Sequence, residues 1–422
     1  MTSQIIALNR LGVAVASDSI ATISDADGNY VATVSASKVF DIGAGHKIVL
    51  LNSDNTWLSG APIDVLIAAW TRTLAEPLPT VWDYLENFLD WLESQKDDLF
   101  PDMESLFRGF IYEQLRPISE RIAAACDGLR PFNSDTSLRA ESDPTFARVY
   151  KSRVGKEVNL YLKNLNALPD LKLVDDKFSP EDQLARQKNA CDAADVKSMI
   201  DLWFPDAVIS TSTKAKLLRE IHKSIGRHPL ERHDSLCRLT FVGFGSDEVY
   251  PSVYELGLET KFRNIVRWRG LGKSTVDTEE RRSEIYLMAQ TSAISNFLDG
   301  VHPNFLQNLK AIVPTAVADA SRLWDDSPDN QDDDSYEIWK GMGNDVFEKL
   351  QNYISDFRIK NKSGLTDRLD FMGPGDLAKI AKALVELEVL ATLNSRGPST
   401  VGGEVILATV DLRDGVTWHS KV

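Results

Sequence analysis

Residues 2–18 read TSQIIALNRLGVAVASD, and this stretch decides which fold class we expect for the chain. Two short apolar runs, 4–8 and 13–16, lie on either side of a turn at Leu11-Gly12. Apolar runs of this length bounded by turn formers are typical of short β-strands. We therefore expect the chain to begin with two strands, the second of which ends at Asp18.

Strand-like and helix-like segments alternate in blocks along the rest of the sequence. We expect one core domain in three pieces, 1–75, 237–302 and 372–422, interrupted by helical insertions at 76–236 and 303–371. Strands grouped together, with helices segregated around them, predict a layered α+β sandwich. The second insertion contains a cluster of aspartates whose mutual repulsion indicates a disordered surface loop and not a metal site. Its members are Asp325, Asp326, Asp329, Asp332, Asp333 and Asp334.

The composition excludes several classes of partner. The 422 residues include 47 Lys and Arg against 62 Asp and Glu, which gives a formal net charge of −15. Nucleic acids and anionic membranes are bound through clustered cations, so we expect neither as a partner. Three widely separated cysteines indicate no disulfide framework. We find no apolar run of membrane-spanning length and no signal peptide, and we expect a cytoplasmic protein.

Thr2 is the first candidate for chemistry. A small residue after the initiator favours removal of Met1, which would leave Thr2 with a free α-amine. A threonine hydroxyl is a weak nucleophile, but an adjacent α-amine with an ordinary pKa of about 7.7–8.0 can accept its proton. The alternative interpretation is that this threonine has no function, because Met-Thr at the start of a chain is a weak signal by itself.

Lys38 and Asp18 are the second candidates. In a strand through VSASKVFDI, residues 34–42, alternation places Lys38 on one face with four apolar neighbours. Burying an unpaired ammonium there would cost on the order of several kcal/mol, and Asp18 is a natural partner of opposite charge. Such a pair beside Thr2 would lower the pKa of the threonine hydroxyl. The alternative is that Lys38 extends its ammonium into water at the sheet edge.

Four blocks of the sequence together resemble the N-terminal nucleophile (Ntn) hydrolases, in particular proteasome β-subunits, HslV-type peptidases and bacterial proteasome-like proteins. Thr2 and Asp18 are 16 positions apart, as the nucleophile and the aspartate are in that family. SKVFDIG at 37–43 resembles the strand that carries the family's lysine. LTFVGFGSDEVYPSVYELGLE at 239–259 resembles its central hairpin. Residues 376–421, with the VGG at 401–403, resemble its closing helix and strands.

The resemblance implies a four-layer αββα Ntn-hydrolase sandwich with added helical insertions. It also implies threonine-dependent hydrolysis of amide bonds, no metal, no cofactor, and in many members a ring-shaped homo-oligomer. In that arrangement Thr2 is the nucleophile, Lys38 is the catalytic lysine and Asp18 holds Lys38.

The sequence departs from the family where the threonine amine is normally oriented. The family has a serine before its final Gly-Gly and an aspartate three residues earlier, and this chain has Val401 and Pro398 there. Ser399 and Thr400 lie close by, so Ser399 is a candidate supporting residue. The family's other supporting serine would fall near Gln290 or Thr291. Two candidates remain open for the backbone N–H of the oxyanion hole: Ser53 by strand length, and Gly60 as the nearest glycine.

Several other signals have a simpler interpretation. GLGKS at 270–274 lacks the glycine that a phosphate-binding loop requires, because Arg267 occupies that position. Arg263, Arg267 and Arg269 share one face of a strand, and we expect that face to be solvated. The histidines have no spaced cysteine or carboxylate partners that would indicate a zinc site. They are His222, His228 and His233.

We therefore expect a threonine-type amidohydrolase, most simply a peptidase acting on a peptide or protein substrate, that forms a homo-oligomer. One alternative is a catalytically silent scaffold or assembly subunit of the same fold, and another is an amidase for a small molecule. The insertion at 76–236 follows the first helix and is a candidate docking site for a partner protein.

Overall fold

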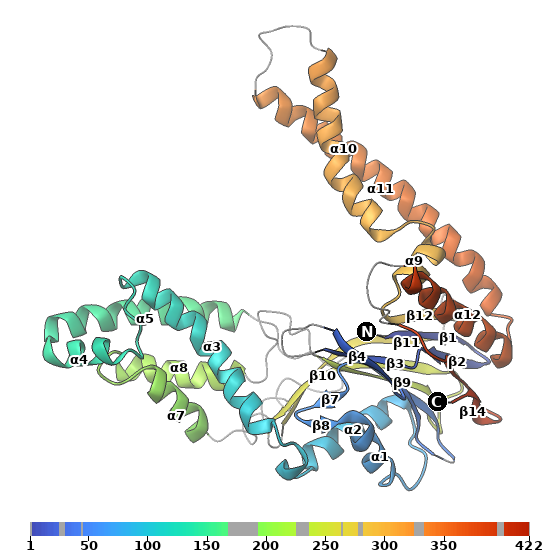
Figure 1. The fold of residues 1–422 in the computed structure, drawn as a ribbon, viewed down its shortest axis with the longest axis horizontal. Coiled ribbons are helices and arrows are strands. Elements are labelled where there is room, and N and C mark those ends of the chain that lie inside the picture. Colours follow the sequence, from blue (N-terminus) through green and yellow to red (C-terminus); the bar gives the residue numbers. More distant parts are fainter. Residues whose placement is uncertain are drawn as a thin grey trace. The chain divides into compact units, whose positions relative to one another are not determined.

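The computed structural model describes residues 2–24, 30–43, 45–167, 193–224, 236–262, 265–276, 282–324, 333–394 and 401–421 (Figure 1). It combines helices with antiparallel strand pairs, so the α+β class expected from the sequence is confirmed. One five-stranded sheet has the order β12-β1-β2-β13-β14, and a second has the order β11-β10-β9-β6-β5. The first sheet consists of β1 (Ser3–Asn9), β2 (Gly12–Ser17), β12 (Ser283–Ala289), β13 (Ile406–Asp411) and β14 (Gly415–Ser420).

The expected N-terminal strands form an antiparallel hairpin, in which Gln4 pairs with Ser17 and Asn9 with Gly12. The Asn9 side chain accepts hydrogen bonds from the backbone N–H groups of Leu11 and Gly12, at 2.8 and 3.2 Å, and so holds the turn. A Cβ at Gly12 would lie 2.8 Å from the carbonyl oxygen of Val410, which explains the glycine at this position. Every residue of both strands is buried, so both faces of the hairpin are covered.

Helix α12 (Pro374–Leu393) contacts β1, β2 and β13 and covers one face of the first sheet. Its apolar side chains pack with those of the hairpin in one core, to which α9 (Ser292–Asp299) also contributes. Representative members are Ile5, Ala14, Ile294, Leu377 and Leu384. The helix expected in the first part of residues 376–421 is therefore present and begins at Pro374.

The second sheet is built from β5 (Val39–Asp41), β6 (Lys47–Asp54), β9 (Cys237–Phe244), β10 (Ser252–Phe262) and β11 (Ile265–Thr275). Two small pairs complete the strands, β3 (Ile20–Ser24) with β4 (Tyr30–Ser35) and β7 (Trp57–Leu58) with β8 (Ala61–Pro62).

The continuous strand expected through residues 34–42 was wrong. Strand β4 ends at Ser35 and β5 begins at Val39, so Lys38 lies in the irregular segment between them. Lys38 and Val39 are both buried, which strict alternation would not produce. The burial of Lys38 therefore comes from its specific partners and not from the period of a strand.

The chain divides into two compact units. Unit 1 consists of residues 1–49, 242–252 and 274–422, and unit 2 consists of residues 50–241 and 253–273. These bounds differ from the core and insertion bounds expected from the sequence, which stay a prediction. The three candidate residues Thr2, Asp18 and Lys38 all belong to unit 1.

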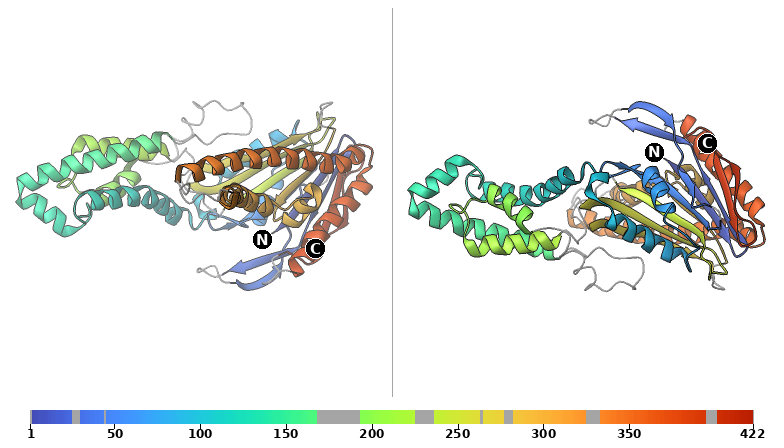
Figure 2. Two further views of the ribbon diagram at one scale, coloured as in Figure 1. Left: turned by 90° about the horizontal axis from the view of Figure 1, so that it is seen from above. Right: turned by 90° about the horizontal axis from the view of Figure 1, so that it is seen from below.

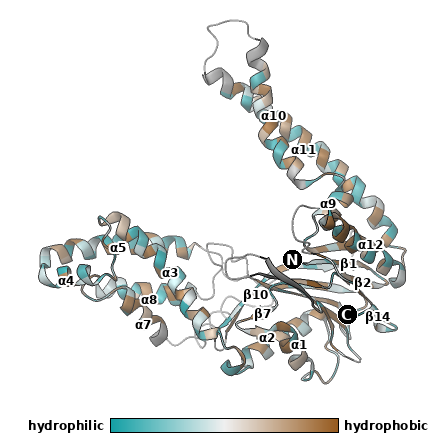
Figure 3. Cartoon of the chain, in the orientation of Figure 1, coloured by the Kyte–Doolittle hydropathy of each residue, from teal (hydrophilic) through white to brown (hydrophobic). Residues whose placement is uncertain are grey.

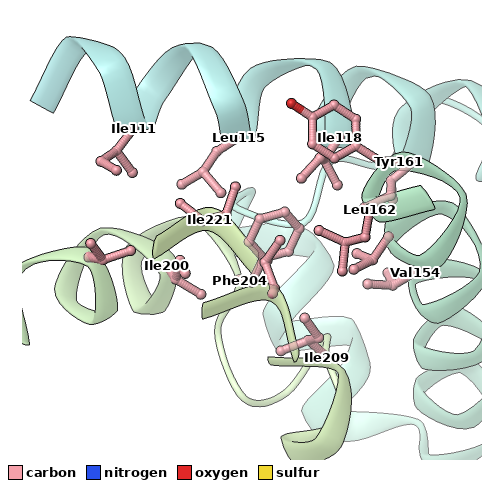
Figure 4. Packing of buried hydrophobic residues seen from close by; sticks show 14 of the residues in the cluster. Ile111, Leu115, Ile118, Val154, Tyr161, Leu162, Ile200, Phe204, Ile209 and Ile221 are labelled. Atoms are coloured by element: carbon pink, nitrogen blue, oxygen red, sulfur yellow. The ribbon is translucent and has the colours of Figure 1, made fainter. Parts of the chain in front are cut away.

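The helices of unit 2 occupy the segment between β8 and β9. They are α1 (Ile63–Thr71), α2 (Val81–Ser94), the short 3₁₀ helix η1 (Asp97–Leu99), α3 (Met103–Ala125), α4 (Ser134–Ser142), α5 (Pro144–Asn166), α7 (Ala193–Trp203) and α8 (Thr211–Ser224). Figure 4 shows how side chains of α3, α5, α7 and α8 point into a common core, among them Leu115, Leu162, Ile200 and Ile221. Phe262 and Ile265, at the ends of β10 and β11, belong to the same core and attach this helical part to the strands.

Unit 1 contains a helical hairpin of α10 (Pro303–Trp324) and α11 (Asp333–Leu369), which lie side by side in all the views (Figure 2). A Cβ at Gly343 would lie 2.5 Å from the Cα of Pro314, so the two helices approach very closely at this point. Of the predicted acidic loop, residues 325–332 lie outside the described residues. Within the described part of the chain, no helix combines the length and the apolar character that crossing a bilayer requires.

The structure corrects the expectation that the arginines of β11 lie on a solvated face. The side chain of Arg267 is 1% exposed and pairs with Glu259, whose carboxylate lies 2.7 Å from its guanidinium. Arg269 is 21% exposed, and Arg263 lies outside the described residues. GLGKS at 270–274 lies within β11 and not in a loop before a helix, which agrees with our rejection of a phosphate-binding loop.

Candidate active site

Thr2 lies immediately before β1, between β12 and β2 of the first sheet. Its carbonyl oxygen accepts a 2.7 Å hydrogen bond from the backbone N–H of Gln290, which directly follows β12. The residue is only 6% exposed. The backbone of Thr2 is therefore held by the sheet at a buried position.

Asp18 directly follows β2, and its backbone N–H donates to the carbonyl oxygen of Ser3 at 3.1 Å. Its carboxylate is fully buried and accepts three hydrogen bonds. Oδ1 accepts from the backbone N–H of Ser3 at 3.0 Å and from Nζ of Lys38 at 2.7 Å, and Oδ2 accepts from the backbone N–H of Gly402 at 3.2 Å. One carboxylate thus connects the residue after Thr2, the buried lysine and the C-terminal part of the chain.

Lys38 is 3% exposed, so the alternative in which its ammonium reaches water at the sheet edge is wrong. Nζ donates to Asp18 and also to the carbonyl oxygen of Ile20, at 2.5 Å. Burial lowers the pKa of Lys38 below its ordinary value of 10.5, although the neighbouring charge of Asp18 opposes that effect. The structure therefore brings Asp18 and Lys38 together in unit 1 as a buried ion pair.

The site includes two contributors that the sequence reasoning did not assign. The Gln4 side chain donates to the Ser17 hydroxyl at 3.3 Å and to the carbonyl oxygen of Lys38 at 3.5 Å. The carbonyl oxygen of Gly402 accepts from the backbone N–H of Ser19 at 3.1 Å, so this glycine contacts both Asp18 and its neighbour. The resemblance of the VGG at 401–403 to the family was the available signal.

The neighbouring position, Gly403, requires glycine. It has a φ of +77°, and a Cβ there would lie 2.4 Å from the hydroxyl oxygen of Ser19. Val401 is fully buried, so the position at which the resembled family has a serine is occupied here by an apolar core residue. The other three positions singled out in this segment, Pro398, Ser399 and Thr400, lie outside the described residues.

Gln290 and Thr291, near which the family's other supporting serine would fall, directly follow β12. Gln290 holds Thr2 through its backbone N–H. Thr291 precedes α9 and makes no side-chain hydrogen bond to cap it. Glu388 of α12 does so instead, because its carboxylate accepts from the backbone N–H groups of Ala293 and Ile294 at 2.9 and 3.1 Å.

The two oxyanion-hole candidates belong to unit 2, so the structure does not assign either of them to the site around Thr2. Ser53 is a buried residue of β6. Gly60 has a φ of +85°, and a Cβ there would lie 2.7 Å from the Asp102 carboxylate. The turn between β7 and β8 and its close contact with Asp102 account for this glycine without any catalytic role.

Among the described residues, no three histidine, cysteine, aspartate or glutamate side chains gather in a group that could hold a metal ion. Separately, the buried pair of Asp18 and Lys38 can supply electrostatic stabilisation and proton transfer. Neither the protein-family models nor the curated proteins that were searched match this chain.

Proposed function

We propose that the chain is a threonine-type amidohydrolase with the four-layer αββα sandwich of the Ntn hydrolases, and that it cleaves amide bonds in peptides. The support is the coincidence of sequence motif and geometry. Asp18 and Lys38, which resemble the family's aspartate and lysine, form a buried ion pair, and Asp18 also accepts from the backbone N–H of Ser3, the residue after Thr2. A cytoplasmic location, a homo-oligomer and a peptide or protein substrate are parts of the same proposal.

In the proposed mechanism, loss of Met1 exposes the α-amine of Thr2. The threonine Oγ attacks the substrate carbonyl carbon while its proton moves to the α-amine. The protonated amine then passes the proton to the leaving nitrogen, and the C–N bond breaks to leave an ester on Thr2. Water attacks this ester, and the proton it loses returns to the Thr2 oxygen through the same amine. The ammonium of Lys38, held by Asp18, stabilises the negative charge that develops on the attacking oxygen.

The single observation that carries this proposal is the shared acceptor Oδ1 of Asp18. It accepts from Nζ of Lys38 at 2.7 Å and from the N–H of Ser3 at 3.0 Å. Ser3 is covalently bonded to Thr2, so one oxygen fixes the position of the ammonium relative to the start of β1. A buried charged pair is costly to keep for stability alone, and a catalytic role gives it a reason.

The direct test is an electrophilic peptide probe, followed by intact-mass and peptide mass analysis. We expect loss of Met1 and one adduct on Thr2, and we expect Thr2→Ala to eliminate the adduct. Ser3→Ala is the matched control, because its hydroxyl is buried without a hydrogen-bond partner and the substitution leaves the backbone N–H in place. Retention of Met1, or an adduct that persists in Thr2→Ala, would contradict the proposal.

The labelling rate is expected to depend on pH in two steps. It should rise as the α-amine of Thr2 loses its proton, around its ordinary pKa of about 7.7–8.0. It should fall again when Lys38 loses its proton, and burial lowers the pKa of Lys38, so this fall should begin below 10.5. Rates measured between pH 6 and 11 with a probe that does not itself titrate test both steps. A rate that declines steadily from pH 6 upward would argue against the amine as the base.

Val401 favours a second candidate function, a catalytically silent subunit of the same fold. A fully buried valine cannot orient an amine by hydrogen bonding, as the family's serine does. This candidate predicts no adduct on Thr2 in the wild-type protein, so the labelling experiment also separates the two functions.

A further inference from the structure

Helix α11 carries an apolar stripe on its exposed surface, formed by Met342, Val346, Tyr353 and Phe357. These side chains are 50%, 49%, 71% and 46% exposed, respectively. Their spacings of four, seven and four residues place them along one side of the helix. Exposed large apolar side chains gathered on one side of a helix are typical of a protein interaction site. Figure 3 shows apolar positions along α11 between polar ones.

The stripe is separate from the side of α11 that packs on α10. That side contains Gly343, which lies against Pro314, and Phe347, which is 8% exposed. Helix α11 also contacts α9, β12 and β1, and Phe357 of the stripe lies close to Gly300, which follows α9. Phe357 nevertheless remains 46% exposed, and the packing on α10 does not account for the apolar row.

These four residues are arranged symmetrically about a point between Lys349 and Leu350. If a second α11 runs antiparallel about a two-fold axis through this point, Met342 lies opposite Phe357 of the other copy. Val346 then lies opposite Tyr353 of the other copy. Trp339, which is 43% exposed and lies on the same side of the helix three residues before Met342, falls outside this symmetry and would lie opposite Lys360 of the other copy. A two-fold interface uses the same surface on both subunits, and this spacing fits that requirement without a shift in register.

The charges on α11 favour the same antiparallel arrangement. Between residues 337 and 348 the helix has three acidic residues and one basic residue, which are Glu337, Asp345, Glu348 and Lys340. Between residues 349 and 369 it has more basic than acidic residues, namely Lys349, Arg358, Lys360, Lys362 and Arg368 against Asp356 and Asp367. Arg358 already pairs with Asp299 of α9, and the remaining residues of this half still carry a net positive charge. Antiparallel copies place the acidic half of each helix beside the basic half of the other, whereas parallel copies would place like charges together.

We propose that the apolar stripe of α11 is the interface through which two copies of this chain dimerise, with the two α11 helices antiparallel. This interface is independent of the proposed catalytic function, because it lies on a different element and uses none of the residues around Thr2.

Sedimentation velocity of the full-length protein over a range of concentrations tests the interface. We expect a monomer–dimer equilibrium, and we expect Val346→Glu to weaken the dimer by about tenfold or more, since it buries a charge in the apolar contact. Ile359→Glu is the matched control, because Ile359 is an exposed isoleucine of the same helix, at 66%, and its position is not on the stripe. Circular dichroism checks that both variants keep their helices.

Cysteine cross-linking tests the orientation, in a Cys191→Ser background because Cys126 and Cys237 are buried. Met342 and Phe357 are 15 residues apart, or roughly 22 Å along a helix. In an antiparallel dimer, Met342→Cys and Phe357→Cys should each fail to form a disulfide alone, and a mixture of the two should form one. Cross-linking of each variant with itself would indicate parallel helices and overturn the orientation. A wild-type monomer at every concentration, or an assembly that Val346→Glu leaves intact, overturns the interface.

Discussion

Lys38→Ala is expected to abolish covalent labelling of Thr2 and to lower the free energy of unfolding by about 3 kcal/mol. Removal of the ammonium leaves the Asp18 carboxylate buried without its counter-charge. Breaking a buried ion pair typically costs about 3–5 kcal/mol, and we expect the lower end because the backbone N–H groups of Ser3 and Gly402 still donate to the carboxylate. Urea unfolding gives the stability change, and labelling under native conditions gives the chemical change.

Lys379→Ala provides the matched control for this prediction. Lys379 pairs with Asp376 at 2.8 Å, nearly the distance of the Lys38–Asp18 pair, but its side chain is 80% exposed. An exposed pair contributes about 0–1 kcal/mol, so this substitution should change neither stability nor labelling appreciably. If Lys38→Ala labels at the wild-type rate while remaining folded, Lys38 is a structural residue and the proposed mechanism fails.

Asp18→Asn tests the same pair from the other side. The carboxylate has two acceptor oxygens, and all three of its hydrogen-bond partners are donors. An asparagine side chain offers only one acceptor oxygen, so its amide group must face either the donors at Oδ1 or the N–H of Gly402. We expect Asp18→Asn to lower both the labelling rate of Thr2 and the free energy of unfolding. A loss of both would indicate that Asp18 acts through its hydrogen bonds and not through its negative charge alone.

The sequence predicted the N-terminal hairpin and the Asp18–Lys38 pair because both depend on local signals. Two apolar runs around a turn specify the hairpin, and a single lysine among apolar residues requires a partner of opposite charge. The reason given for the burial of Lys38 was nevertheless wrong, since the segment around it is not a strand. Its burial depends on the carbonyl oxygen of Ile20 and on Asp18, and no period in the sequence reports such contacts.

The features that the sequence did not predict depend on contacts between residues far apart in the chain. The backbone N–H of Gly402 donates to Asp18, although 384 positions separate the two residues in the sequence. The motif at 401–403 resembled the family, but it could not predict that Gly402 contacts Asp18. The side chain of Arg267 was expected in water, because a strand with alternating arginines resembles a solvated face. Its surroundings include Phe110 of α3 and the carbonyl oxygen of Ser224 at the end of α8, and contacts with these helices are not visible in the pattern of the strand.

Glu259→Ala is expected to destabilise unit 2 by about 3–5 kcal/mol, because it leaves a buried guanidinium without its counter-charge. Both Nε and Nη2 of Arg267 donate to the Glu259 carboxylate, at 3.1 and 2.7 Å. Burial lowers the pKa of Arg267, and Glu259 is the main influence that opposes this effect. Further partners of Arg267 include the carbonyl oxygen of Ser224 at 3.5 Å and the ring of Phe110, whose centroid lies 4.8 Å from the guanidinium carbon.

Through these contacts, the Glu259–Arg267 ion pair connects the strands of unit 2 to its helices. Glu259 and Arg267 belong to β10 and β11, whereas Phe110 and Ser224 belong to α3 and α8. Loss of the carboxylate should therefore loosen the helices from the strands, and hydrogen exchange should increase at the end of α8 before it increases in β10.

Two further variants show whether charge or shape is responsible. Asp54→Ala breaks the pair between Asp54 and Arg238, whose side chains are 34% and 36% exposed, so it should cost no more than about 1 kcal/mol. The double variant Glu259→Leu with Arg267→Met removes both buried charges and replaces them with apolar side chains of similar volume. It should recover most of the stability that Glu259→Ala loses, because neither charge then remains uncompensated. If the double variant is as unstable as Glu259→Ala, the connection between helices and strands depends on the geometry of the arginine side chain and not on its charge.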